Sequence, residues 1–551
     1  MRFDAERAPL VVGAVFLALA LHGLGAYDVV GDDEAREVGI VQDVAAGHWL
    51  WPRFNDRMIP DKPILFHWVA AIPCLVAGFS ETAVRLPAAL AAAGLVAWTT
   101  WFGMRTLGAN PGIAAGLLLA TFPAFFDRAR VARPDTLMLV LLATALGLAW
   151  TAWRHDRRRD ATSALVLLGL ATFVKGPVPP VLFGATMVAF LAWQRELRRL
   201  RLFLSVPGLA AFVLLGFGWY AVAMAGWGDE FVRQHLVGRY VRNLAGGLAQ
   251  GRAYSPKSLG YHLSFYPIHL LSIALPWTPL VVAAVIRLAR RRGFANPLVR
   301  FLVCWIVVPV VVFTPAEYKL RYYLLPCLPP LALLAAPLAV ELVTRPLGHL
   351  RATRQSIVAG LIVLLAGAAA AWLALARPDL LSEADQAVLE AVLASIPGGK
   401  GVAAAIVGML LGVTGAAVVL RLWGPLIAVT GALAIGWLAV GAPAVAVRAS
   451  QAQSLRPFAE TIRDRFPAPG ALAFYGETVR SVVVYVGHPV PSLGRDARRI
   501  TPGLGVIATP AAYEVLARAG YVGPTLAIGS GLTGNLERAT LVLAEGLEKP
   551  R

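Results

Sequence analysis

Charged residues are scarce in this sequence. They make up 15% of its 551 residues, whereas 58% are hydrophobic, and an ordinary soluble domain carries about 25% charged residues. Long apolar segments recur from Val11 to Val445, and many reach the roughly 20 residues that a bilayer span needs. This scarcity excludes an ordinary soluble protein and predicts a mainly α-helical, polytopic membrane protein.

Cysteine is also rare. Cys74, Cys304 and Cys327 all lie in apolar runs, and no two of them have metal-ligand spacing. This number and placement exclude a disulfide framework and a cysteine-based metal site. We interpret the three residues as small buried hydrophobic side chains.

Acidic residues are fewer than basic ones. The chain has 32 Asp and Glu against 50 Lys and Arg, which gives a formal net charge of +18. No nucleic-acid recognition motif accompanies this charge, so we expect no nucleic-acid partner. Four short loops between apolar segments are dense in arginine, at 154–159, 195–201, 287–292 and 345–354. These loops fall on one side if 64–79 is interfacial or re-entrant, and the positive-inside rule then places the N-terminus in the cytoplasm.

The spacing of the apolar runs predicts about thirteen transmembrane helices. The first is interpreted as a retained signal anchor. The expected spans are 8–27, 82–106, 111–126, 134–153, 161–173, 177–193, 204–226, 266–287, 299–315, 321–343, 355–376, 402–420 and 425–446. We expect a transmembrane domain at 1–446, whose first outer loop, 28–81, carries interfacial helices.

From residue 447 onward, charged residues return and short apolar runs alternate with turn residues. This pattern predicts a small extracytoplasmic α/β domain at 447–551. We expect helices at 455–466 and 513–519. We expect strands at 471–475, 482–486, 505–509, 525–528 and 539–544.

The first outer loop carries two groups of charged residues. Asp33 follows Gly31-Asp32 at the outer end of a span, where it is either part of a solvated helix N-terminus or a general base at the membrane surface. Asp61 and Lys62 lie between two prolines. Lys62 either binds a phosphate at headgroup depth or forms an ordinary surface ion pair.

Three further outer segments, together with Lys175 at another turn, bring charges to the same side. Asp135 begins a span after Arg133 and either forms an ion pair with it or acts in function. Loop 227–265 is basic, although the positive-inside rule predicts few cations on the outer side. Segment 317–323 and Lys175 add further polar groups there. This convergence predicts an enzyme or transporter acting on an anionic lipid. Charges at span ends and no clear repeat favour the enzyme.

Several ordered motifs resemble the GT-C fold glycosyltransferases that use polyprenyl-phosphate donors. The resemblance is to the bacterial aminoarabinose (4-amino-4-deoxy-L-arabinose) lipid A transferases, relatives of the protein O-mannosyltransferases. The motifs lie at 33–36, 47–52, 61–68, 84–87, 132–135, 175–177, 275–279 and 319–326, and the stretch 455–489 resembles the family's outer domain.

The resemblance implies roles for five residues. Asp33 would be the principal catalytic carboxylate, with Asp135 beside it. Lys62, Arg239 and Tyr323 would hold the phosphate of the polyprenyl-phosphate sugar.

The resemblance also implies a divalent cation, zinc or magnesium, bound by Asp61 and His235. The family usually has Glu where this chain has Asp61. Two ligands alone do not complete a metal site. No nucleotide cofactor is implied.

The implied activity is an inverting transfer of a sugar from a polyprenyl-phosphate donor at the extracytoplasmic face of a bacterial inner membrane. The acceptor stays open between a lipid A-like lipid, another glycan and a protein, and the sugar is open as well. The alternative is a transporter or flippase of lipids or lipid-linked sugars, which also needs many spans and cations.

Overall fold

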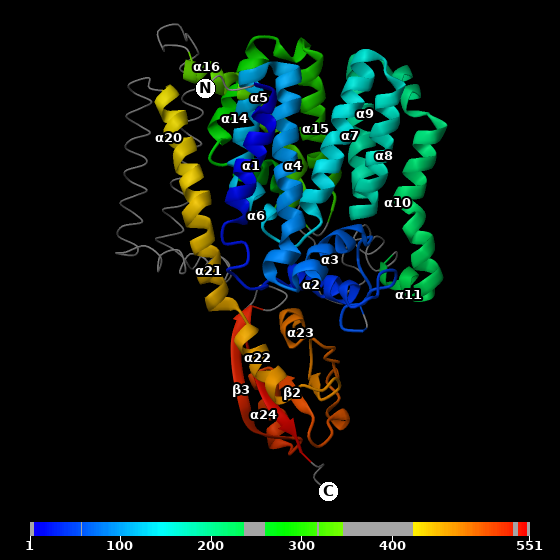
Figure 1. Cartoon of the computed structure of the whole chain (residues 1–551), viewed down its shortest axis with the longest axis vertical. Coiled ribbons are helices and arrows are strands. Elements are labelled where there is room, and N and C mark those ends of the chain that lie inside the picture. The colour runs from blue at the N-terminus through cyan, green and yellow to red at the C-terminus, as the bar shows by residue number, and fades with distance from the viewer. Residues whose placement is uncertain are drawn as a thin grey trace.

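The computed structural model describes residues 5–56, 58–235, 259–316, 319–344, 423–532 and 538–547. Helices run side by side in one bundle, two helices lie across one end of it, and a small sheet lies beyond them (Figure 1). Within these residues five helices are long and apolar enough to cross a membrane, or up to seven if each of two bent pairs is one span. A mainly helical, multi-pass membrane protein is thereby confirmed.

The bundle contains most of the helices that hydrophobicity predicts. Its first half comprises α1 (Ala8–Leu21), α4 (Glu81–Leu107), α5 (Ala109–Ala120), α6 (Pro123–Ala129), α7 (Asp135–His155), α8 (Arg158–Lys175), α9 (Val178–Gln194), η2 (Leu197–Phe203), α10 (Val206–Trp227) and the short α11 (Asp229–Phe231). Its second half comprises α13 (Leu259–Ile273), α14 (Thr278–Arg290), α15 (Pro297–Phe313), η6 (Arg321–Cys327), α16 (Leu328–Thr344), α20 (Trp423–Gly436), η9 (Trp437–Gly441) and α21 (Ala442–Gln453). The expected spans 355–376 and 402–420 lie outside the described residues, so the count of thirteen stays a prediction.

Two expected spans are not single straight helices. Segment 111–126 corresponds to α5 and α6, which meet at 68°, and segment 266–287 corresponds to α13 and α14, which meet at 111°. A proline follows each break, Pro123 at the start of α6 and Pro279 in the first turn of α14. Proline has no N–H to continue the preceding helix, but it fits the first turn of a new one.

Two helices, α2 (Asp32–Ala45) and the largely apolar α3 (Leu65–Ala77), lie across one end of the bundle (Figure 1). Helix α3 has only 13 residues, too few for a straight bilayer span. Its placement agrees with an interfacial helix at 64–79.

The two ends of the bundle differ in charge. Asp135 begins α7 and Arg154 lies in its last turn, and a helix of this length separates them by about 30 Å. Arg158 begins the antiparallel neighbour α8, and Lys175 ends it. The arginine-rich turn 154–159 therefore lies at the end of the bundle opposite to Asp135 and Lys175.

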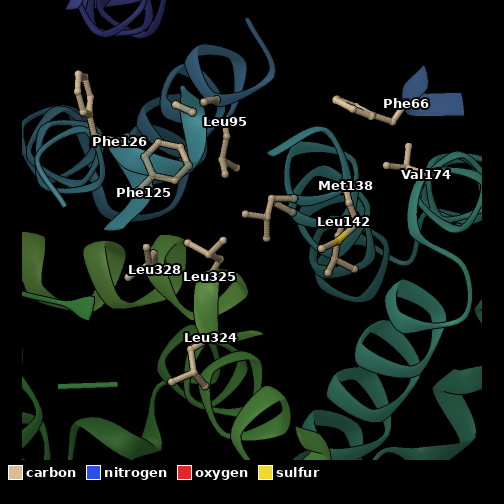
Figure 2. Packing of buried hydrophobic residues seen from close by; sticks show 14 of the residues in the cluster. Phe66, Leu95, Phe125, Phe126, Met138, Leu142, Val174, Leu324, Leu325 and Leu328 are labelled. Atoms are coloured by element: carbon tan, nitrogen blue, oxygen red, sulfur yellow. The ribbon is translucent and has the colours of Figure 1, made fainter. Parts of the chain in front are cut away.

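A continuous apolar core holds the bundle together. Phe125 and Phe126 of α6, Leu325 of η6, and Met138 and Leu142 of α7 gather in this core, and all five are at most 3% exposed (Figure 2). Inside a bilayer such side chains stabilise the bundle by close van der Waals packing, because lipid tails are as apolar as the side chains themselves. They fix the helix ends that carry the polar residues described below.

The C-terminal part contains a four-stranded sheet in the order β1-β2-β4-β3. Strands β1 and β2 are parallel, whereas β4 is antiparallel to both β2 and β3. The strands are β1 (Leu472–Phe474), β2 (Gly505–Ala508), β3 (Val522–Leu532) and β4 (Arg538–Gly546), and the helices are α22 (Arg456–Arg465), α23 (Arg480–Val486), the 3₁₀ helix η10 (Ala497–Arg499) and α24 (Pro510–Arg518). Because α21 continues to Gln453, a domain boundary at 446 stays a prediction.

The expected strand at 482–486 is wrong, because these residues belong to helix α23. Its valines suggested a strand, but every residue from Ser481 to Val486 is buried. A short helix that is apolar all round is stable only when it is enclosed. Helix α23 is enclosed between α2 and α22, with which it makes its main contacts.

Candidate active site

Helix α2 provides the centre of a polar network. Gly31 precedes it in an extended conformation, and Asp32, Asp33 and Glu34 form its first turn, where carboxylates interact favourably with the positive end of the helix dipole. The helical repeat places Asp33, Arg36 and Glu37 on one face. Arg36 Nη2 lies 3.5 Å from Asp33 Oδ1 and donates to Glu37 Oε1 at 3.1 Å.

Glu37 is the buried hub of this network. Its side chain is 1% exposed. One carboxylate oxygen accepts from Lys62 Nζ, and the other lies 2.8 Å from His67 Nε2 on α3. Burial alone would raise the pKa of Glu37, but Lys62, His67 and Arg36 outweigh it and hold the pKa well below its usual range. Glu37 is therefore an ionised carboxylate that joins α2 to loop 60–63 and to α3.

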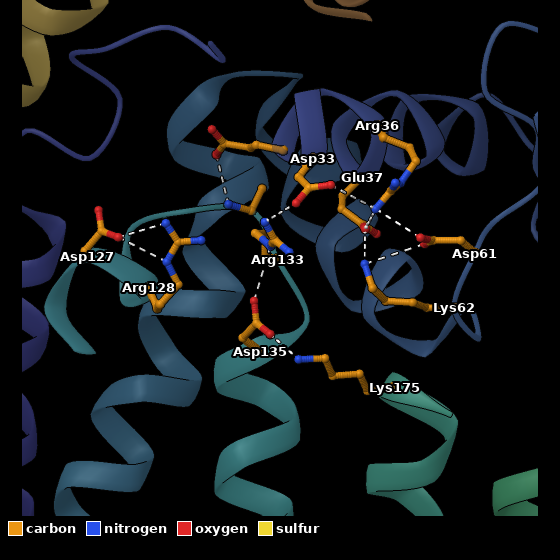
Figure 3. A network of polar contacts seen from close by, with 12 residues as sticks. Asp33, Arg36, Glu37, Asp61, Lys62, Asp127, Arg128, Arg133, Asp135 and Lys175 are labelled. Carbon is orange, nitrogen blue, oxygen red and sulfur yellow. Dashed lines mark hydrogen bonds and ion pairs between the residues drawn. The ribbon is translucent and has the colours of Figure 1, made fainter. Parts of the chain in front are cut away.

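Asp61 shares two of these cations. Its carboxylate lies 3.2 Å from Arg36 Nη2 and 3.6 Å from Lys62 Nζ. The Asp61–Lys62 pair that the sequence singles out is thus connected to the Asp33 helix through Arg36 (Figure 3).

The loop around Arg130–Asp135, which the sequence predicts as the second outer loop, reaches the same network. Arg133 Nη1 donates to Asp33 Oδ2 at 2.7 Å, and its Nε lies 3.2 Å from Asp135 Oδ2. Asp135 also accepts a hydrogen bond from Lys175 at the end of α8. Arg133 therefore bridges Asp33 and Asp135, the two carboxylates for which the resemblance implies a catalytic role, and Lys175 pairs with the second of them (Figure 3).

The network contains as many carboxylates as cations. Its members are Asp33, Glu37, Asp61 and Asp135 on one side, and Arg36, Lys62, Arg133 and Lys175 on the other. Each buried charge is paired, as burial in a low-dielectric environment requires.

Asp33 is the accessible carboxylate of the set. Its side chain is 41% exposed, against 18% for Asp61 and 6% for Asp135. Burial acts to raise its pKa, but Arg133, Arg36 and Lys62 together lower the pKa below its usual value. Asp33 is therefore ionised at neutral pH and reachable by a substrate.

Helix α2 is held in place by a further buried pair. Arg85 of α4 is 0% exposed and contacts both carboxylate oxygens of Glu34, at 2.8 and 3.1 Å. The same guanidinium donates to the backbone carbonyls of Leu24 and Tyr27. Glu34 also accepts from the backbone N–H of Ala132, which fixes the second outer loop against α2.

The arginines of this loop lie at the end of the bundle opposite to the arginine-rich turn 154–159, and each has a local partner. Arg130 is 4% exposed and donates to the carbonyls of Ala20, His22 and Gly23, which end α1. Arg128 pairs with Asp127, and its guanidinium lies 3.8 Å from the centre of the Tyr322 ring. Only Arg133 of the three joins Asp33 to Asp135 within the described contacts.

Tyr323 lies on η6, where its ring is 4.9 Å from that of Phe313. Its neighbour Tyr322 is the residue that contacts Arg128 of α6. Contact of Tyr323 with a donor phosphate stays a prediction. The same holds for Arg239, which lies outside the described residues.

The expected metal pair is not assembled by the described contacts. His235 is buried, with its ring stacked on Phe231 and its Nδ1 2.9 Å from the carbonyl of Pro60, next to Asp61. Asp61 contacts Arg36 and Lys62. In the part of the chain that the structure describes, no group of three or more His, Cys, Asp or Glu residues is arranged to hold a metal ion. A cation at Asp61 and His235 therefore stays a prediction.

Sequence reasoning missed Glu37 and His67 as parts of the site. Glu37 follows Asp33 by four residues, and this spacing places both on one face of the expected helix. His67 was visible only as a polar residue in an apolar run. Its partner is 30 residues away in the chain, so packing of α3 on α2 decides the contact.

The chain is similar to known glycosyltransferases. Residues 61–220 match the family profile of Dolichyl-phosphate-mannose-protein mannosyltransferase. An undecaprenyl phosphate-alpha-4-amino-4-deoxy-L-arabinose arabinosyl transferase of Pseudomonas fluorescens is 28% identical over 68% of this chain and 66% of its own length. A transferase of the same name from Pseudomonas aeruginosa is 30% identical over 63% of this chain and 62% of its own length. Another from Erwinia tasmaniensis is 27% identical over 55% of this chain and 54% of its own length. The matches thus cover less than two thirds of these relatives.

The whole fold has solved counterparts. The crystal structure of ArnT from Cupriavidus metallidurans in the apo state covers 97% of both chains with a TM-score of 0.75 at 18% identity. The same protein bound to undecaprenyl phosphate covers 97% of both chains with a TM-score of 0.71 at 19% identity. At such identities the likeness concerns the fold. The chain is thus a multi-pass membrane protein of the GT-C fold that resembles the bacterial aminoarabinose transferases and the protein mannosyltransferases.

Proposed function

We propose that this protein transfers a sugar from a polyprenyl-phosphate donor to an acceptor at the extracytoplasmic surface of a bacterial inner membrane. The observation that carries the proposal is the network of paired charges around the accessible Asp33, at the bundle end opposite to the arginine-rich turn 154–159. A lipid-phosphate enzyme needs cations for the phosphate and a carboxylate for the acceptor in one place.

The proposed orientation follows from the same asymmetry. The positive-inside rule puts the turn at 154–159 in the cytoplasm. The site, with Asp33 and Asp135, then faces the outside, as does the C-terminal sheet, and the N-terminus is cytoplasmic.

The proposed reaction forms one bond and breaks one bond. An acceptor oxygen attacks the anomeric carbon of the sugar from the face opposite to the phosphate, so configuration inverts. The bond from that carbon to the phosphate oxygen breaks, its electron pair stays on the oxygen, and the polyprenyl phosphate leaves as a phosphomonoester. Cations lower the barrier by stabilising the charge that develops on this leaving group.

Asp33 serves the acceptor side in this proposal. If the acceptor is a hydroxyl, Asp33 takes its proton as the new bond forms. If the acceptor is a phosphate of a lipid A-like lipid, no proton needs to be removed, and Asp33 orients it or stabilises positive charge on the sugar. Asp135 supports Asp33 through Arg133, which contacts both.

Lys62, Arg239 and Tyr323 serve the donor side. Lys62 is 7% exposed and contacts Glu37 and Asp61, so a donor phosphate has to compete with these carboxylates for its ammonium group. A phosphate oxygen is a strong acceptor for such a charged donor.

The names of the relatives indicate which donor to test first. They carry undecaprenyl phosphate-alpha-4-amino-4-deoxy-L-arabinose in their names. We therefore propose an undecaprenyl-phosphate sugar as the donor class, with aminoarabinose as the first sugar to test and lipid A as the first acceptor. Other glycans and proteins remain as acceptors for the same assay.

Reconstitution tests the proposal. The purified protein in proteoliposomes is supplied with undecaprenyl-phosphate aminoarabinose and membranes that contain lipid A, other glycans and proteins. Mass spectrometry should detect undecaprenyl phosphate and an acceptor that has gained the sugar. Movement of labelled donor across the bilayer without any new glycosidic product would instead identify a flippase and overturn the proposal.

A further inference from the structure

A second carboxylate, Asp32, precedes Asp33 in the first turn of α2 and has a different partner. Arg480, the first residue of α23, donates from Nη1 to Asp32 Oδ2, although the two are 448 residues apart in the chain. Both side chains are 21% exposed. The pair thus links the C-terminal part directly to the turn that carries the proposed catalytic carboxylate.

The C-terminal part also contacts the rest of the first outer loop. At the far end of α2, Gln42 Nε2 donates to the Val484 carbonyl at 3.2 Å. Asn55 exchanges two hydrogen bonds with the backbone of Val490, at 2.8 and 2.6 Å. The docking of the C-terminal part on loop 28–81 therefore rests on several contacts and does not depend on Arg480 alone.

Further docking contacts lie beside the start of α2. The Tyr485 hydroxyl accepts from the Val29 N–H at 2.6 Å and donates to Glu81 at 3.1 Å. Arg456 lies 3.1 Å from the carboxylates of both Asp28 and Glu81. These contacts hold α22 and α23 against residues 28–29 and the start of α4 whether or not Asp32 is charged.

Arg36 follows Asp32 by four residues and Asp33 by three on α2, so the helical repeat places both carboxylates within reach of its guanidinium. Burial raises the pKa of Asp32, and the charges of Arg480 and Arg36 oppose this rise. Arg36 already contacts Asp33, Glu37 and Asp61. An unpaired carboxylate at Asp32 would attract Arg36 away from these three partners, because like charges repel and opposite charges attract most strongly where water is excluded.

We propose that Arg480 is a positioning residue of the active site. By pairing with Asp32 it neutralises the neighbouring charge and keeps Arg36 directed at Asp33, Glu37 and Asp61. Through the charge of Arg480, the C-terminal part thus influences the active site electrostatically, in addition to its docking contacts with α2. This inference rests on the proposed sugar transfer.

Three variants in the full-length protein separate this role from simple docking. The readout is the initial rate of undecaprenyl phosphate release in the proteoliposome assay, at saturating donor and equal protein. Arg480→Ala should lower kcat about tenfold, Asp32→Asn alone should stay within about threefold of the wild type, and the double variant Asp32→Asn/Arg480→Ala should recover to that level. A docking contact alone predicts no such recovery, because the double variant also lacks the ion pair.

Two further variants keep the test decisive. Arg480→Lys retains the charge and should retain kcat, while Asn55→Ala removes a docking contact remote from Asp32 and should leave kcat unchanged. If the double variant is as slow as Arg480→Ala, or if Asn55→Ala is equally slow, the positioning role is contradicted. Full activity of Arg480→Ala contradicts it as well. Failure of the wild type to transfer any sugar would contradict the proposed function instead.

Discussion

Arg133 donates a 2.7 Å hydrogen bond to Asp33, which lies 100 residues earlier in the chain. Through its Nε the same guanidinium lies 3.2 Å from Asp135. This relationship connects loop 28–81 with the loop around Arg130–Asp135. It also gives Arg133 two carboxylate partners at the end of the bundle opposite to the arginine-rich turn 154–159.

Removal of the Asp33 charge should abolish most of the activity. Asp33→Asn keeps the size of the side chain but removes the carboxylate, and loss of a general base typically costs about 10²–10⁴ in rate. The initial rate of sugar transfer in proteoliposomes measures the effect. Asp32→Asn on the same helical turn is the matched control, and equal loss in both variants would contradict the assignment of Asp33.

The pH dependence of transfer should reflect the lowered pKa of Asp33. Because the pKa lies below its usual value of 3.8, Asp33 stays ionised from about pH 8 to pH 5. Its pairing with Arg133, and the stability that this pairing contributes, is lost only as pH falls through the lowered pKa. Arg133→Gln removes the strongest opposing charge, so burial raises the pKa and the acidic limb of the rate profile should move to higher pH. An unchanged limb would count against this account.

Lys62→Met should weaken donor binding, because a charged hydrogen bond to the phosphate is lost. We expect the KM for the undecaprenyl-phosphate sugar to rise about tenfold or more. Since the substitution also leaves Glu37 without its ammonium partner, the double variant Lys62→Met/Glu37→Gln provides a version that lacks both charges. If its KM returns to the wild-type value, Lys62 serves only to pair with Glu37.

Glu37→Ala should lower stability more than any other single change in the network. It leaves Lys62 and Arg36 buried beside a missing carboxylate, and loss of one partner of a buried pair costs about 3–5 kcal/mol. Thermal unfolding in lipid nanodiscs measures the shift in midpoint. Asp61→Ala, at a position with a more exposed side chain, should give a smaller shift.

Arg130→Met should destabilise the protein without slowing the folded enzyme. The substitution leaves the carbonyls that end α1 unpaired, at a cost of about 1–3 kcal/mol for each group that stays buried. The midpoint of thermal unfolding should fall, while kcat per folded molecule stays the same. A large loss of kcat at unchanged stability would place Arg130 in the reaction rather than in the fold.

Much of the helical framework could be predicted, because the length and polarity of apolar runs reflect the bilayer directly. Segment 134–153 corresponds to α7 and segment 204–226 to α10, within two residues at each end. The bends at Pro123 and near Pro279 could not be predicted, since hydropathy reports the composition of a segment and not its direction. The expected first span, 8–27, ends earlier, at Leu21, and is followed by Gly23 in a left-handed conformation.

The strand expected at 482–486 shows the limit of local preference. Valine favours strands when one face packs and the other is paired in a sheet. Here the whole segment is enclosed against α2, which lies more than 400 residues earlier in the chain. Such tertiary enclosure overrides a weak preference and cannot be read from the segment itself.

The site was predictable where its residues cluster in the chain. Asp33, Asp61 with Lys62, and Asp135 stand out as charges next to apolar spans, and the structure brings them into one network. The role of Glu37 as the hub was not predictable, because its contacts with Lys62 and His67 depend on how α3 packs on α2.

Transfer by the reconstituted wild type and by Asp33→Asn, followed by mass spectrometry of donor and acceptor, tests the central claim most directly. We predict that the wild type converts an undecaprenyl-phosphate sugar into undecaprenyl phosphate and a glycosylated acceptor, and that Asp33→Asn does so at least about a hundredfold more slowly. Donor that crosses the bilayer intact in both proteins, with no glycosylated product, would contradict the claim.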